Sequence, residues 1–93
     1  VGVTVFVAVK TSQHHQQWFD TLRDVVMGIP EIVEFYRMSG DVDYLLRVVV
    51  PDIRAYDSVY KRLTQAVALS DVSSSFAMEE IKFTTALPLN YAQ

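Results

Sequence analysis

The centre of the chain reads Ile32-Val-Glu-Phe-Tyr-Arg-Met-Ser-Gly-Asp-Val-Asp-Tyr-Leu-Leu-Arg-Val-Val-Val50. β-Branched and aromatic residues dominate both ends of this stretch, which predicts strands over 32–38 and 44–50. The run between them, 39–43, is rich in turn residues, and Gly40 suits a position with positive φ. The stretch therefore predicts a β-hairpin, around which the rest of the chain can be arranged.

On the N-terminal side of the hairpin, a valine stands at every odd position from Val1 to Val9, the period of a β-strand. Thr11 or Ser12 is a plausible N-cap for the helix that follows. Gly28 and Pro30 supply its stop signals. The helix is predicted by apolar residues spaced three and four apart, namely His15, Trp18, Phe19, Leu22, Val25, Val26 and Ile29.

On the C-terminal side, Pro51 ends the hairpin and Asp52 can cap a second helix. A last strand is expected over 72–84, and the tail 86–93 is expected to be irregular or a docking arm. The second helix is predicted by a stripe that comprises Ile53, Tyr56, Tyr60, Leu63 and Val67.

The order of elements is thus β-α-β-β-α-β. Two right-handed crossovers and one hairpin predict an α+β fold of the ferredoxin-like type, with a four-stranded antiparallel sheet and both helices on one face. Residues 1–93 contain no linker long enough to divide them, so we expect one domain. Apolar residues such as Phe6, Ala8 and Tyr36 cannot all point at the helices, which predicts a partner surface on the other face. A self-complementary dimer is the economical answer; the alternative is a monomer with an unusually apolar outer face.

Composition and motifs argue against several functional classes. The net charge of −3 and the absence of cysteine disfavour nucleic-acid binding by this chain alone, a disulfide framework and a thiolate site. His14 and His15 diverge on a helix, Glu79 and Glu80 point to opposite faces of a strand, and Ser73–Ser75 lacks a base and a nucleophile elbow. We therefore expect no enzyme activity, no catalytic residue, no metal and no cofactor. The apolar runs are too short to span a bilayer and no signal peptide is visible, so we expect a cytoplasmic protein without a membrane partner.

The hairpin loop is richer in polar groups than its structural role requires. Backbone N–H groups around a glycine turn can hold a carboxylate, and Asp41 or Asp43 can pair with an ammonium group. Together they form a simple receptor for an α-amino acid. The competing interpretation is that the two aspartates only build the turn. On the receptor hypothesis, Gly40 is structurally essential, whereas Asp43 can be replaced without loss of stability.

The segment Tyr36–Asp52, with its Gly-Asp-x-Asp-Tyr-Leu run, resembles the Lrp/AsnC family of bacterial and archaeal transcription regulators. It is similar to the C-terminal effector-binding domain of these proteins, called the RAM domain. The runs Gly2–Lys10 and Asp71–Lys82 and the residues 84–88 fit the same resemblance, which covers essentially the whole chain.

This resemblance implies a domain that dimerises through its sheet, further assembly of the dimers, commonly into a ring of four dimers, and an amino-acid effector bound between dimers. DNA would be bound only through an N-terminal helix-turn-helix domain, which is absent from 1–93. The chain is then a fragment of a regulator or, less favoured, a stand-alone effector domain. The ligand-binding residues implied are Tyr36, Met38, Ser39, Gly40, Asp41 and Asp43 of the hairpin, and Ser74, Ser75 and Phe76 of the last strand.

Two other functions stay open at this stage. One is a small ferredoxin-like enzyme, because the fold itself supports many chemistries. The other is a purely structural dimerisation module whose pocket binds nothing physiological. Only an amino-acid sensor should change its assembly when an amino acid is added.

Overall fold

The central hairpin forms as the sequence predicts. The computed structural model describes residues 2–12, 15–67 and 71–89. In it, β2 (Ile32–Arg37) pairs antiparallel with β3 (Tyr44–Val50), with an irregularity between Ile32 and Glu34. Gly40 has φ +100°, a backbone conformation that favours glycine. The loop therefore adopts the turn conformation that its glycine predicts.

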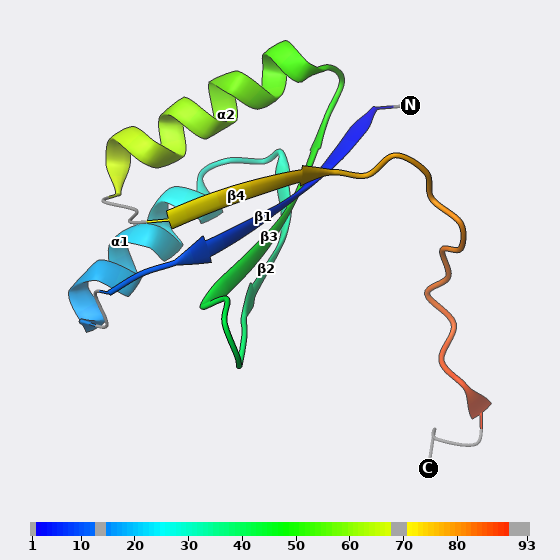
Figure 1. The fold of residues 1–93 in the computed structure, drawn as a ribbon, viewed down its shortest axis with the longest axis horizontal. Helices are drawn as coiled ribbons and strands as arrows, with labels where there is room; N and C mark the ends of the chain where they lie inside the picture. The colour runs from blue at the N-terminus through cyan, green and yellow to red at the C-terminus, as the bar shows by residue number, and fades with distance from the viewer. Residues whose placement is uncertain (1, 13–14, 68–70, 90–93) are drawn as a thin grey trace.

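The two β-α-β halves assemble into the predicted ferredoxin-like α+β fold. The order is β1 (Val3–Lys10), α1 (Gln16–Met27), β2, β3, α2 (Ile53–Ala66) and β4 (Asp71–Phe76). The strands lie in the order β2-β3-β1-β4, and every neighbouring pair is antiparallel. Both helices cover the same face of the sheet (Figure 1). No helix in the described ranges has the length and apolarity needed to cross a membrane.

The core lies between the sheet and the two helices. Alternate residues of the central strands point into it and are almost completely buried, namely Val5, Val7, Val9, Leu46, Val48 and Val50. The helices cover these residues with Trp18, Leu22, Val26, Tyr56, Val59 and Leu63. Packing of this kind provides most of the stability of a small domain.

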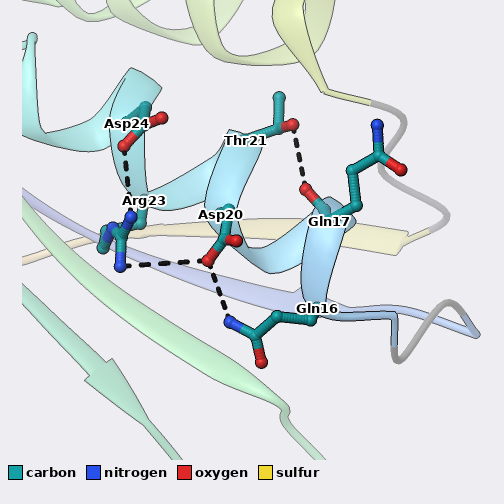
Figure 2. Close-up of polar contacts among 6 residues, drawn as sticks. All are labelled: Gln16, Gln17, Asp20, Thr21, Arg23 and Asp24. Atoms are coloured by element: carbon teal, nitrogen blue, oxygen red, sulfur yellow. Dashed lines mark hydrogen bonds and ion pairs between the residues drawn. The ribbon is translucent and has the colours of Figure 1, made fainter.

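The solvent face of α1 is held by local polar contacts (Figure 2). The Nε2 of Gln16 donates a hydrogen bond to Asp20 over 2.9 Å, and Arg23 lies 3.8 Å from the same carboxylate. Thr21 donates its hydroxyl proton to the Gln17 carbonyl. These contacts stabilise the helix surface and leave the other face of α1 for the core.

The start of α1 differs from the prediction. The helix begins after His15, which caps it without a side-chain hydrogen bond, whereas Thr11 is buried at the end of β1. Ser12 is exposed and also lies outside the helix. His14 lies outside the described residues. His15 is exposed, so the apolar stripe effectively begins at Trp18.

The second helix is capped as predicted, but its buried face is rotated. Asp52 accepts a hydrogen bond from the Ala55 N–H over 2.8 Å. Ile53 is 67% exposed and Tyr60 36% exposed, while Val59 is buried. At about 100° per residue, Ile53 and Tyr60 lie on one side of Tyr56 and Val59 lies on the other. The sheet contacts the Val59 side. The predicted apolar stripe is therefore correct for Tyr56 and Leu63 but wrong for Ile53 and Tyr60.

The last strand is shorter than predicted. β4 ends at Phe76, which pairs with Val5, and the N–H of Ala77 then donates to the Thr4 carbonyl. Because β1 begins at Val3, which would lie opposite Met78 in this register, it has no partner for residues 79–84. Residues 77–89 continue as an extended segment that leaves the sheet and runs away from both helices (Figure 1).

Candidate functional site

The hairpin loop is anchored to the end of β1 by Asp43. The N–H of Asp43 donates to the Val9 carbonyl, and its own carbonyl accepts from the Met38 N–H, each over 2.9 Å. Its carboxylate Oδ2 accepts from the buried Thr11 N–H over 2.8 Å. Asp43 therefore links the loop to the end of β1, and on these contacts we expect its replacement to lower stability, contrary to the expectation from the sequence. Its second carboxylate oxygen is not part of this contact.

An aromatic cluster supports the loop from the core side. The ring of Tyr44, the first residue after Asp43, has its centroid 6.0 Å from Trp18 and 5.8 Å from both Phe19 and Phe35. These rings come from α1, β2 and β3. The sequence shows each ring as an ordinary apolar residue, and only the packing of α1 on the hairpin brings them together.

The remaining loop residues are open to solvent. Met38 is 41% exposed and Tyr36 is 49% exposed, and Ser39, Gly40 and Asp41 are also exposed. A Cβ built on Gly40 would meet nothing within 4 Å. The loop and the end of β2 therefore leave backbone, a carboxylate and two large side chains accessible to solvent.

The predicted residues of the last strand lie elsewhere in the same chain. Phe76 pairs with Val5, whereas Tyr44 pairs with Val9, and β1 lies between the two strands. Four residues along β1 correspond to about 13 Å. One protomer therefore does not bring Phe76 to the hairpin loop.

The three residues of β4 also face different sides of the sheet. The Ser74 hydroxyl is hydrogen-bonded to the Tyr56 hydroxyl, and the Phe76 ring packs edge-on against Tyr56 with centroids 5.4 Å apart. Burial raises the pKa of Tyr56, and its hydrogen bond with Ser74 acts in the opposite direction. Ser75 pairs with Phe6, whose side chain points to the outer face.

The outer face of the sheet carries a hollow that the sequence does not indicate. It measures about 480 Å³ and lies between the sheet and the first residues after β4. Arg47 and Glu34 form an ion pair of 3.7 Å beside it. Phe6, at 39% exposure, supplies an apolar part of its lining.

The fold defines a small α+β domain of the ferredoxin-like class, and comparison with known proteins identifies its family. The Lrp/AsnC ligand binding domain matches residues 4–87. The chain therefore belongs to the Lrp/AsnC family, as its resemblance to the RAM domain indicates.

Curated relatives of the chain are transcription regulators. It is 51% identical over 90 residues to the DNA-binding transcriptional activator DecR of Escherichia coli K12, covering 96% of this chain and 59% of that protein. It is 48% identical over 89 residues to the glutamate uptake regulatory protein of Zymomonas mobilis, covering 96% of this chain and 54% of that protein. The chain thus spans between half and two thirds of the length of these relatives.

Solved structures agree with this assignment. An AsnC family transcriptional regulator from Agrobacterium tumefaciens matches with a TM-score of 0.90 and 60% identity, over 99% of this chain and 60% of that one. The regulator NMB0573 from Neisseria meningitidis, solved as a complex with L-Met, matches with a TM-score of 0.86 and 29% identity, over 98% of this chain and 59% of that one.

Proposed function

We propose that this chain is the amino-acid-sensing and oligomerisation module of a transcription regulator. The observation that carries the proposal is its match, over nearly its whole length, to a Neisseria regulator that binds L-methionine. The chain would act as a regulator in the cytoplasm and not as an enzyme. DNA would be contacted by a separate N-terminal domain of the full-length protein, as the length of the relatives supports.

In this proposal the hairpin loop would supply the polar groups that an α-amino acid requires. Exposed backbone N–H groups around Gly40 suit a carboxylate, and Asp41 suits an ammonium group. Because one oxygen of Asp43 already holds the Thr11 N–H, Asp41 is the carboxylate that is freer to meet a ligand. Met38 and Tyr36 would contact an aliphatic or sulfur-bearing side chain.

The proposed ligand site also requires a second protomer. The outer sheet face has exposed Phe6 and Tyr36 and part-buried Ala8 and Leu45, an apolar surface that fits a sheet-to-sheet dimer. Ser74, Ser75 and Phe76 lie far from the loop of their own chain, so they would join a ligand site only across an interface between dimers. Binding there would favour one assembly over another, which is the requirement for allostery.

Calorimetry combined with light scattering tests the proposal. L-Methionine, L-leucine and L-cysteine are titrated into the protein, and the assembly is measured with and without each. We expect at least one to bind in the roughly micromolar to millimolar range and to change the assembly. Asp41→Asn should weaken binding, whereas Asp24→Asn on the exposed surface of α1 should not. An intact assembly that binds none of them would instead support a structural dimerisation module.

A further inference from the structure

The segment that follows β4 exposes a series of large apolar side chains. We call residues 77–89 the arm. Its five large apolar side chains are 66–95% exposed, and they are Met78, Ile81, Phe83, Leu87 and Leu89. Large apolar side chains exposed along one segment indicate a contact with another molecule.

The arm has the sequence of a strand but lacks a strand partner in its own sheet. Ile81 and Phe83 alternate with Lys82 and Thr84, the two-residue period of a β-strand. In the described residues, the β1–β4 ladder nevertheless ends at Phe76. Past Met78, which would lie opposite Val3 in this register, β1 has no residue left to pair with the arm. The arm therefore has the residue pattern of a β-strand, but its strand partner would have to come from outside this sheet.

The first residues of the arm border the hollow on the outer sheet face but do not fill it. Ile81 and Phe83 line the same 480 Å³ hollow as Phe6 and Arg47, yet they remain 87% and 66% exposed. The chain's own arm thus forms one wall of the hollow without occupying it. Apolar side chains of an added segment can fill this space against Phe6.

The length of the arm allows it to reach another molecule. At about 3.3 Å per residue, residues 77–89 extend for roughly 40 Å, whereas three gaps of about 4.8 Å separate the outer strands of the sheet. The arm also leaves the body of the protein rather than folding back over it (Figure 1). Its large side chains would contribute several hundred Å² to an interface, a substantial part of the roughly 800 Å² per partner that a stable dimer buries.

We propose that the arm of one protomer crosses to a second copy of this chain and fills the hollow on that copy's outer sheet face. Ile81 and Phe83 of one protomer would pack on the surface formed by Phe6 and the stem of Arg47 in the other. Two-fold symmetry makes the exchange reciprocal. This inference rests on the proposed sheet-to-sheet dimer and adds the arm as the element that holds it.

Sedimentation equilibrium tests the contribution of the arm. The double variant Ile81→Ser/Phe83→Ser should raise the dimer dissociation constant at least tenfold. Met27→Ser is the matched control, because Met27 is 77% exposed on α1 but lies away from the hollow. Circular dichroism should show the same folded content in all three proteins, since these side chains are outside the core.

The absence of cysteine allows a direct test of the crossing. Phe6→Cys and Phe83→Cys are introduced into separate chains that carry tags of different mass, and the two are mixed and oxidised. We expect a disulfide-linked species containing one chain of each kind. A native dimer that is unaffected by the arm substitutions and gives no mixed cross-link would overturn the arm inference alone. A native protein that stays monomeric at high concentration would overturn the sheet-to-sheet dimer as well.

Discussion

Replacement of Asp43 separates the structural role of the hairpin loop from its proposed ligand-binding role. In Asp43→Ala, the buried Thr11 N–H loses a charged acceptor that lies 2.8 Å away. A hydrogen bond to a charged group contributes about 1.5–3 kcal/mol, and the lower end applies because the contact is only part-buried. For a domain of this size, a loss of about 1.5–2 kcal/mol lowers the melting temperature by roughly 6–16 °C.

Urea unfolding at one fixed protein concentration measures this loss, because the stability of an oligomer depends on concentration. Asp43→Asn should keep most of the stability, since its side-chain carbonyl can still accept the Thr11 N–H. Asp41→Ala is the control, and its exposed side chain should change stability by less than about 0.5 kcal/mol. If Asp43→Ala were as stable as Asp41→Ala, the anchoring role of Asp43 would be refuted.

Three further substitutions test the fold around the site. Gly40→Ala should lower the free energy of unfolding, measured by thermal unfolding, by about 1 kcal/mol. The cause would be backbone strain at φ +100°, because a Cβ at this position meets no neighbour. Gly2→Ala should lower the free energy of unfolding in urea by roughly 1–3 kcal/mol, because its Cβ would lie 2.4 Å from the Val50 carbonyl oxygen. If the variant were as stable as the native protein, this strand end would have to move freely. Tyr56→Phe removes the hydrogen bond with Ser74 and should cost about 1 kcal/mol at neutral pH. Because burial raises the pKa of Tyr56, its ionisation favours the unfolded chain as the pH rises above about 10. The native protein should therefore lose more stability than Tyr56→Phe in this pH range. Parallel profiles of stability against pH for the two proteins would contradict this.

The sequence by itself determined the order of the elements and the centre of each. Period-two and period-three-to-four patterns report which side of a strand or helix is apolar, and this information is local. The hairpin was predicted from its turn residues, and Gly40 takes the positive φ that its position required. The cap at Asp52 was predicted for the same reason, because capping depends on a side chain and an N–H only three residues apart.

Only the tertiary structure decided where those patterns stop and which residues meet. The strand pattern runs on to Thr84, but β4 ends at Phe76. In the observed register β1 begins opposite Met78, so it has no partner for residues 79–84. The carboxylate of Asp43 could be assigned to Thr11 only once β1 and the hairpin lay side by side, 32 residues apart in sequence. Contacts of this kind are made between elements distant in the chain, so the composition and spacing of each segment alone carry no record of them.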